Sequence, residues 1–195
     1  MITNFKHLLM YAEDVFDKKK CDKVLRKYWG RTWKDATVKE SGNKEQVQID
    51  ETLRISEVLW LKEQWIFDYI WPWMQEANDQ TGWCYDIRGC EDIQLTRYKV
   101  GSFYDFHTDG LGDHVSKDHG GMVRKLSMTI FLNDDYEGGE FQFAKYHKGE
   151  VEILTQEHKA GGAVIFPSSL DHRVKPVTKG VRYSLVIWFI GPPFA

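Results

Sequence analysis

The sequence predicts an α+β fold, with helices in the first half of the chain and a β-sandwich or β-barrel in the second half. Apolar residues recur at helical spacing in two segments before residue 91. From Asp92 onward, short runs of β-branched and aromatic residues are separated by Gly, Asp, Asn and Pro. The chain has 195 residues, which is enough to bury one core. We therefore expect a single domain over residues 1–195, with mainly helical support in 1–91 and a β-rich core in 92–195.

The first predicted helix extends from about Val15 to Trp33. This segment is rich in Lys and Asp, and its apolar residues fall at roughly helical spacing, which indicates a surface helix: Phe16, Val24, Leu25 and Tyr28. Gly30 is expected to end it. The polar stretch 34–50 predicts a loop followed by a short extended segment.

The second predicted helix begins after Ser56, a plausible N-cap. Its apolar residues recur near a 3.6-residue period: Leu59, Ile66, Ile70 and Trp73. Pro72 is expected to kink or end this helix unless it opens a new first turn. The first half also holds seven of the eight tryptophans. We expect five of them to brace the outside of the β-rich core: Trp60, Trp65, Trp71, Trp73 and Trp83.

Eight short strands are predicted in the second half. They are Ile93–Val100, Phe103–His107, Leu126–Leu132, Glu140–Phe143, Val151–Leu154, Ala163–Phe166, Arg173–Val177 and Arg182–Ile190. The segment Gly110–Val123 contains four glycines among His and Asp and has no apolar periodicity. We expect a mobile loop there, and a lid is one role that such a loop can play.

The charge balance argues against two classes of partner. The 26 basic and 29 acidic side chains leave a net charge of -3, which gives no broad positive surface for nucleic acid or for an anionic membrane. No segment approaches the roughly 18 to 20 apolar residues of a membrane span. The first eleven residues lack the pattern of a signal peptide. The three cysteines lack metal-type spacing, so we expect free thiols in a cytoplasmic protein: Cys21, Cys84 and Cys90.

The sharpest chemical feature is His107-Thr108-Asp109, at the end of a predicted strand. Residues two apart in a strand point to the same face, so the imidazole and the carboxylate can converge on one point. Such a triplet often arises by chance, so the prediction of a metal site also needs a third ligand. Two His and one carboxylate form the facial arrangement that holds non-haem Fe(II). The other histidines that follow this triplet are His114, His119, His147, His158 and His172.

His172 is the favoured third ligand, because it follows a predicted strand and turn and opens the next strand. Ten residues later, Arg182 opens an otherwise apolar segment, 181–190. A buried guanidinium needs an anionic partner, and a bidentate carboxylate is the natural match. A structural salt bridge to an acidic side chain of the chain is the alternative. Combined with the three candidate metal ligands, Arg182 favours a bound carboxylate.

Three stretches of the second half resemble one known family. They are RYKVGSFYDFHTD at 97–109, LSMTIFLNDDYEGGEF at 126–141 and FPSSLDHRVKPVTKGVRYSLVIW at 166–188. Together they are similar to the Fe(II)- and 2-oxoglutarate-dependent dioxygenases, in the prolyl 4-hydroxylase-like branch that includes the PKHD-type hydroxylases. The resemblance covers about Leu95–Ile190.

The resemblance implies a double-stranded β-helix of jelly-roll or cupin-like type, flanked by helices. It implies Fe(II) bound by His107, Asp109 and His172, and 2-oxoglutarate paired with Arg182, with Tyr98 and Ser184 as further cosubstrate contacts. Tyr104 and Trp188 would line the substrate side of the metal. Arg124 is expected to be an exposed residue, with a substrate contact as its alternative role.

The implied reaction is hydroxylation of a C–H bond, coupled to decarboxylation of 2-oxoglutarate to succinate by O2, with ascorbate as a further candidate cofactor. Peptidyl proline is the favoured substrate, and a free amino acid or another small molecule is the alternative. Two lesser alternatives are a non-catalytic β-helix binding module and a cupin-like zinc or iron site that uses His114 or His119. The nucleic-acid demethylase branch expects an arginine where Trp188 stands, and the halogenase variant lacks the carboxylate of Asp109.

Overall fold

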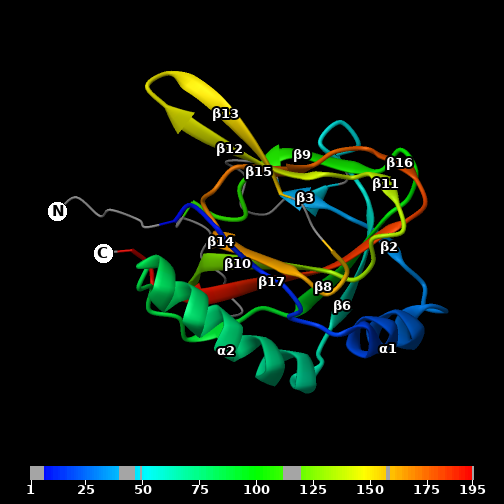
Figure 1. The fold of residues 1–195 in the computed structure, drawn as a ribbon, viewed down its shortest axis with the longest axis horizontal. Helices are drawn as coiled ribbons and strands as arrows, with labels where there is room; N and C mark the ends of the chain where they lie inside the picture. The colour runs from blue at the N-terminus through cyan, green and yellow to red at the C-terminus, as the bar shows by residue number, and fades with distance from the viewer. Residues whose placement is uncertain (1–6, 40–46, 49, 112–119, 157–158, 195) are drawn as a thin grey trace.

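A large antiparallel sheet forms the centre of the computed structural model, which describes residues 7–39, 47–48, 50–111, 120–156 and 159–194 (Figure 1). In spatial order its strands are β1 (Met10–Ala12), β14 (Ala163–Pro167), β10 (Val123–Phe131), β17 (Arg182–Gly191), β8 (Ile93–Tyr98), β6 (Glu57–Leu61) and β2 (Lys34–Asp35), with β7 (Gly89–Cys90) paired to β17. Helices α1 (Lys18–Tyr28) and α2 (Gln64–Thr81) cover one face of this sheet.

A smaller antiparallel sheet faces the other side of the large sheet. Its strands, in order, are β13 (Glu150–Gln156), β12 (Phe141–His147), β15 (His172–Val174), β9 (Phe103–His107) and β5 (Arg54–Ile55). Two further pairs are β11 (Glu137–Gly138) with β16 (Val177–Lys179) and β3 (Val38–Lys39) with β4 (Val47–Gln48). The facing sheets form the jelly roll that the sequence led us to expect, so the predicted fold class is confirmed.

Alternation along the strands separates two cores. On β17, Leu185, Ile187 and Phe189 point to the helices, whereas the residues between them point to the small sheet. The core under the helices includes Ile66, Ile70, Met74 and Ala77 of α2, which fall on one face of that helix. The core between the sheets is rich in aromatic rings, among them Tyr98, Phe131, Phe141, Phe143 and Phe166.

Capping residues mark the start of α1 and the end of α2. Asp17 is the N-cap of α1, and its carboxylate accepts a 2.8 Å hydrogen bond from the Lys20 amide. α2 ends at Gly82, whose left-handed conformation has a φ of 78°. Pro72 lies inside α2, which continues through it to Thr81. Neither helix among the described residues is long and apolar enough to span a membrane.

The prediction of a helix that begins after Ser56 is wrong. Ser56 separates β5 from β6, and α2 begins only at Gln64. The run Glu57–Leu61 is apolar and short, so its pattern fits a strand or a helix equally well. Pairing with β8 decides the outcome: Val58 lies opposite Thr96 in the large sheet.

The first half also contributes strands beside its two helices, because β1, β2, β5, β6 and β7 join the two sheets from that half of the chain. Most of these strands have two or three residues, which is too short for a periodic signal. Trp60 is also corrected: it lies on β6, with its ring 5.9 Å from that of Trp188, and does not brace the outside of the core.

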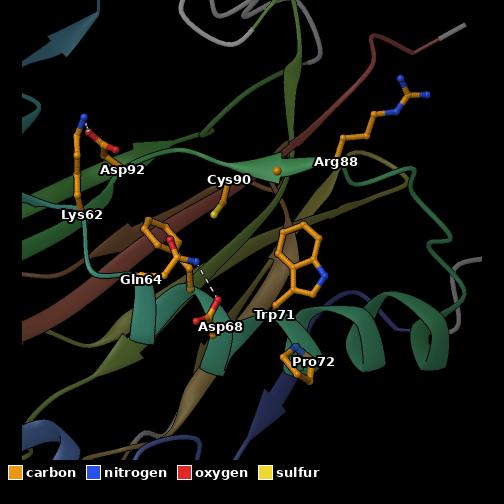
Figure 2. A pocket seen from close by; sticks show the side chains of 10 residues that line it. Lys62, Gln64, Asp68, Trp71, Pro72, Arg88, Cys90 and Asp92 are labelled. Carbon is orange, nitrogen blue, oxygen red and sulfur yellow. Dashed lines mark hydrogen bonds and ion pairs between the residues drawn. The ribbon is translucent and has the colours of Figure 1, made fainter.

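A surface pocket of about 680 Å³ lies on the helix side of the large sheet, where α2 meets the ends of β6 and β7 (Figure 2). Its lining includes Phe67, Trp71 and Cys90, together with Lys62, which forms an ion pair with Asp92. This pocket opens on the face of the sheet opposite to the small sheet. It therefore takes no part in the site described below.

Gly161 is expected to be the glycine at which a side chain is least tolerated. Its φ is +90°, and a β-carbon there would collide with the carbonyl oxygen of Phe16. Its amide also donates a 2.7 Å hydrogen bond to Phe131. We expect Gly161→Ala to lower the free energy of unfolding by about 3 kcal/mol, since the left-handed backbone and the overpacking each add a cost.

The matched control is Gly101→Ala, because Gly101 has a φ of +84° but no atom within 4 Å of the point that a β-carbon would occupy. Its cost should be about 1 to 2 kcal/mol, from the backbone alone. Urea unfolding of both variants measures the difference. Equal losses for the two variants would contradict the crowding at Gly161.

Candidate active site

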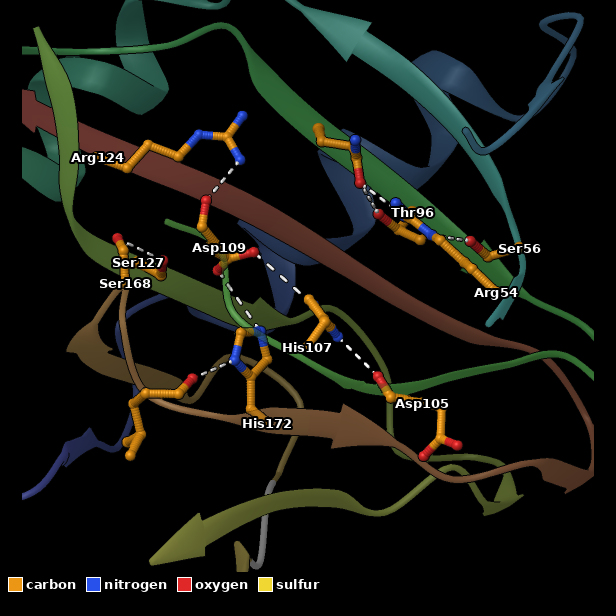
Figure 3. Close-up of polar contacts among 12 residues, drawn as sticks. Arg54, Ser56, Thr96, Asp105, His107, Asp109, Arg124, Ser127, Ser168 and His172 are labelled. Atoms are coloured by element: carbon orange, nitrogen blue, oxygen red, sulfur yellow. Dashed lines mark hydrogen bonds and ion pairs between the residues drawn. The ribbon is translucent and has the colours of Figure 1, made fainter. Parts of the chain in front are cut away.

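Two histidines and one aspartate meet between the two sheets (Figure 3). His107 ends β9, Asp109 follows two residues later, and His172 opens β15. Because β9 and β15 are neighbours in the small sheet, His107 and His172 lie directly opposite each other. Their possible ligand atoms, with one from Asp109, all lie within 4.8 Å of one another. Strand pairing thus brings together two histidines that lie far apart in the sequence.

The two imidazoles are oriented by the backbone. The Nδ1 of His107 lies 2.8 Å from the carbonyl oxygen of Asp105, and the Nδ1 of His172 lies 2.8 Å from that of Leu170. A carbonyl only accepts, so each Nδ1 donates a hydrogen to it, and each ring is held with its Nε2 facing the cluster. The Nε2 atoms lie 3.8 Å and 3.5 Å from the carboxylate of Asp109. Three ligand atoms therefore face one point.

Backbone hydrogen bonds fix the position of Asp109, and one of its carboxylate oxygens is buried. Its amide donates a 2.9 Å hydrogen bond to the carbonyl of Ser168, and its own carbonyl accepts one of 3.2 Å from Arg124. Its Oδ2 is buried and makes no hydrogen bond to the described residues. A buried carboxylate oxygen without a donor fits a metal cation, which would supply the missing partner.

Electrostatics keep this cluster in the form that a metal requires. Burial raises the pKa of Asp109, but the nearby His172 and His107 outweigh it, so the net shift is downward. Burial, with a smaller contribution from His172, lowers the pKa of His107 to about 3. The site near neutral pH is thus a carboxylate with a neutral imidazole, which are the ligand states of a divalent ion.

Arg182 is a buried cation without an anionic partner in the part of the chain that the structure describes. It opens β17, is 1% exposed, and its Nη1 donates a 3.1 Å hydrogen bond to the hydroxyl of Ser184. Its Nε and Nη2 are buried and have no hydrogen-bond partner, and no acidic side chain of the described residues forms an ion pair with it. The structural salt bridge that the sequence left open is therefore not found in the described part of the chain. A bidentate carboxylate fits the two unpaired donors.

The comparisons with known proteins agree with this geometry. The model of a family described as the 2OG-Fe(II) oxygenase superfamily matches residues 93–190, which is half of the chain. The chain belongs to this superfamily. Membership implies Fe(II), 2-oxoglutarate and O2, and the orphaned atoms of Asp109 and Arg182 fit the first two.

Curated relatives in the superfamily include PKHD-type hydroxylases. One from Xylella fastidiosa (strain M12) is 40% identical over 101 residues, which cover 49% of this chain and 42% of the relative. One from Synechococcus sp. (strain CC9902) is 41% identical over 104 residues, which cover 52% of this chain and 42% of the relative. The match thus spans less than half the length of these relatives.

Solved structures of similar fold include prolyl hydroxylases. A Pseudomonas putida prolyl-4-hydroxylase gives a TM-score of 0.70 at 19% identity and covers 94% of this chain and 92% of its own. A prolyl hydroxylase from Trichoplax adhaerens, in complex with a peptide fragment, gives 0.71 at 16% identity and covers 93% and 83%. At these identities the likeness establishes the fold shared within the superfamily.

The other residues proposed for the cosubstrate lie beside Arg182. Ser184 accepts the hydrogen bond already described, and the ring of Tyr98 lies 5.2 Å from the guanidinium. Sequence reasoning missed Tyr136, which lies just before Gly138-Gly139. Burial raises the pKa of its phenol while the charge of the nearby Arg182 opposes the shift, so this phenol lies close to the guanidinium. No pattern in the sequence signalled it.

Of the two residues that we expect to line the substrate side, Tyr104 packs on the cluster and Trp188 packs against Arg124. The ring of Tyr104 stacks on His107, with centroids 3.4 Å apart and planes 9° apart. Trp188 is buried, and its Nε1 has no hydrogen-bond partner among the described residues. The guanidinium of Arg124 lies 3.8 Å above the Trp188 ring. Arg124 is not exposed as expected, because Glu91 binds it through two hydrogen bonds of 2.8 and 2.6 Å.

The remaining histidines do not join the cluster where the structure describes them. His147 lies exposed at the end of β12, in the hairpin that projects from the small sheet (Figure 1). His114, His119 and His158 lie outside the described residues, as does the middle of the loop Gly110–Val123 that we considered as a lid. The cysteines are unpaired in the structure: Cys21, Cys84 and Cys90.

The depressed pKa of His107 predicts a pH dependence of stability for the metal-free chain. The unfolded imidazole binds a proton near pH 6.5, but the folded one does so only near pH 3. The folded state therefore binds fewer protons in this window, and stability falls as the pH drops from 6.5 toward 3. Between pH 7 and pH 5 the expected loss is about 2 kcal/mol.

Urea unfolding at pH 7 and pH 5 in the presence of a chelator measures this loss. In His107→Gln most of the difference should disappear, whereas the exposed His147→Gln should keep it. A His107→Gln variant that loses as much stability as the parent protein would show that another group titrates.

Proposed function

We propose that this protein is an Fe(II)- and 2-oxoglutarate-dependent hydroxylase that oxidises a C–H bond of a peptidyl proline. One observation carries the proposal. A cluster of two imidazoles and a carboxylate lies between the same two sheets as a buried guanidinium without a carboxylate partner in the described chain. One set of groups suits a divalent metal, and the other suits the distal carboxylate of the cosubstrate.

Each part of the site then has a definite task. His107, Asp109 and His172 would hold Fe(II), and Arg182 would bind the far end of 2-oxoglutarate, which fixes the orientation of the group to be cleaved. Bound Fe(II) with 2-oxoglutarate supplies the oxidising power for hydroxylation by O2. Ser184, through its hydrogen bond to Arg182, positions the guanidinium.

Aromatic packing keeps water from the reacting groups. The ring of His172 lies 4.8 Å from that of Phe166 and 5.6 Å from that of Phe141. The fully buried Phe131 and Phe143 continue this wall between the sheets. A dry environment suppresses side reactions of a strong oxidant and strengthens the ion pair proposed for Arg182.

Proline is favoured as the substrate residue by the names of the relatives and by the ring on the substrate side. The curated relatives are PKHD-type hydroxylases, and structures of the same fold include prolyl hydroxylases. Trp188, which packs against Arg124, is a buried apolar ring whose Nε1 has no hydrogen-bond partner among the described residues, and an apolar wall of this kind suits a pyrrolidine ring.

The test is turnover with identified product. The protein with Fe(II), ascorbate, 2-oxoglutarate and a set of proline-containing peptides should release succinate, and mass spectrometry should find peptide that has gained one oxygen atom. The product should depend on 2-oxoglutarate and should be lost in His107→Ala but not in His147→Ala. Oxidation of a small molecule in place of every proline peptide would favour the alternative substrate class.

A further inference from the structure

A second buried arginine lies close to the metal cluster. Arg54 is on β5, directly opposite Tyr104 of β9. Its guanidinium carbon lies 4.5 Å from the centre of the Tyr104 ring, and the same ring stacks on His107. The imidazole covers one face of the phenol ring, so Arg54 is a single aromatic ring away from a proposed metal ligand.

Neutral groups hold the guanidinium of Arg54 in place (Figure 3). Its Nε donates a 2.7 Å hydrogen bond to the hydroxyl of Ser56, and its Nη2 donates one of 2.9 Å to the side-chain oxygen of Gln94. Thr96 donates a further bond, of 3.2 Å, to the same oxygen of Gln94. Arg54 is 6% exposed, and its Nη1 makes no hydrogen bond to the residues that the structure describes.

Comparison with the other arginines shows that this arrangement is unusual for the chain. Near the site, Arg124 is neutralised by Glu91, and on the large sheet Arg97 is neutralised by Glu57. Arg54 and Arg182 are the two arginines buried most deeply among the described residues, and neither has a carboxylate within ion-pair distance there. Since a buried charge without a counter-charge is costly, both positions call for an anionic ligand.

The charges assigned so far leave Arg54 unbalanced. In the proposed function Arg182 is matched by the distal carboxylate of 2-oxoglutarate, and Asp109 is matched by the metal. Arg124 already has Glu91. Among the described residues, one cation therefore remains without a counter-charge when metal and cosubstrate are bound, and the substrate is the component still to be added.

The position of Arg54 also connects it to the substrate side. Gln94, which holds Arg54, lies opposite both Trp60 and Val186 in the large sheet. The ring of Trp60 in turn lies 5.9 Å from that of Trp188. Gln94, which binds Arg54, and Trp188 thus point to the same face of the large sheet.

We propose that Arg54 binds a carboxylate of the substrate. The proposal rests on the proposed function and specifies its substrate class as one that carries an acidic group close to the oxidised carbon. Because only one ring separates Arg54 from His107, the carboxylate belongs to the oxidised residue or to its neighbour. Its source is either the terminal carboxylate of a proline or the side chain of an adjacent acidic residue.

Two matched pairs of probes distinguish these sources. The first pair is N-acetyl-Gly-Pro as the free acid and as the amide. The second is N-acetyl-Gly-Pro-Glu-Gly-amide and the same peptide with Gln in place of Glu. Titration into the anaerobic complex with Fe(II) and 2-oxoglutarate, followed by its visible absorption, gives a dissociation constant for each probe without turnover.

In the parent protein the acidic member of one pair should bind at least about tenfold more tightly than its neutral partner. In Arg54→Gln this ratio should fall to near one, and Arg54→Lys should retain part of it. The surface variant Arg88→Gln should keep the full ratio, because Arg88 pairs with Asp86 far from the site. Because the acidic and the neutral probe are compared within each variant, any effect of the substitution that weakens both probes equally cancels.

Gln94→Glu provides a test that leaves Arg54 in place. The new carboxylate would pair with the guanidinium from inside the protein, so the preference for an acidic probe should disappear although the arginine is present. This variant answers the question even if Arg54→Gln fails to fold.

The outcomes separate the inference from the proposed function. Equal binding of acidic and neutral probes in both pairs, or a preference that survives Arg54→Gln and Gln94→Glu, would overturn the role of Arg54. Oxidation of proline in neutral probes would leave the proposed function standing in that case. Arg54-dependent binding of acidic probes without oxidation of proline would support the carboxylate site and count against proline as the oxidised residue.

Discussion

Asp109→Ala is expected to abolish Fe(II)-dependent turnover of 2-oxoglutarate. Asp109 supplies the carboxylate of the cluster, and its Oδ2 has no hydrogen-bond donor among the described residues. Loss of even an outer-shell partner typically weakens metal binding by about 10- to 100-fold, so loss of a ligand should lower Fe(II) affinity by more than about 100-fold. Metal titration, with succinate release as a second measurement, gives both effects.

Asp105→Ala is the matched control. Asp105 is a neighbouring aspartate whose side chain is exposed, and it orients His107 through its backbone carbonyl, which alanine retains. We expect this variant to keep its metal affinity within a few-fold. Undiminished Fe(II) binding by Asp109→Ala would mean that the metal lies elsewhere.

Asp109→Ala should also remove the gain in stability that metal gives to the parent, because the variant lacks one of the three ligands of the cluster. Thermal unfolding with and without a chelator tests this point. Metal addition should then raise the midpoint of the parent but not that of the variant.

Arg182→Met is expected to have the second largest effect. Removing the guanidinium takes away the proposed partner of the distal carboxylate of 2-oxoglutarate, and truncating one side of a buried charged pair costs about 2–5 kcal/mol. The dissociation constant of 2-oxoglutarate should therefore rise by about 100-fold or more. Calorimetric titration with Mn(II) in place of Fe(II) measures it.

The same variant makes an opposite prediction for stability without ligand. Nε and Nη2 of Arg182 are buried without partners, so replacing the guanidinium by an apolar side chain of similar length should not lower the melting temperature of the ligand-free protein. Ser184→Ala, which removes one neutral hydrogen bond, should weaken 2-oxoglutarate binding only several-fold. Unchanged cosubstrate affinity in Arg182→Met would refute the assignment.

Much of the jelly roll could be predicted because its long strands carry clear patterns. Phe103–His107 forms a strand with the predicted bounds, and β17 begins at Arg182 as expected. The two-residue period of a strand is enough to predict that His107 and Asp109 share one face. The pairing of His172 with His107 is a property of the sheet. The sequence supported His172 through the strand and turn beside it and through the resemblance to a family, but neither gives the register of the two strands.

Other parts of the site depend on contacts that no local pattern records. Arg54 lies beside the metal cluster because the two-residue strand β5 pairs with β9, and such a strand gives no periodic signal. Arg124 was expected to be exposed, since the sequence does not show that Glu91 lies beside it. Tyr136 approaches Arg182 from the segment between β10 and β11, where turn residues surround it.

The short strand β15 has a consequence for how the site and the fold depend on each other. β15 has three residues, and it meets β9 at two register positions, one of which is the pair of proposed ligands His107 and His172. An ion held by both side chains would fasten the middle of the small sheet, as a cross-link between residues far apart in the sequence. Occupancy by metal would then be visible as slower amide exchange in β9 and β15, with little change in the strands that pack on the helices.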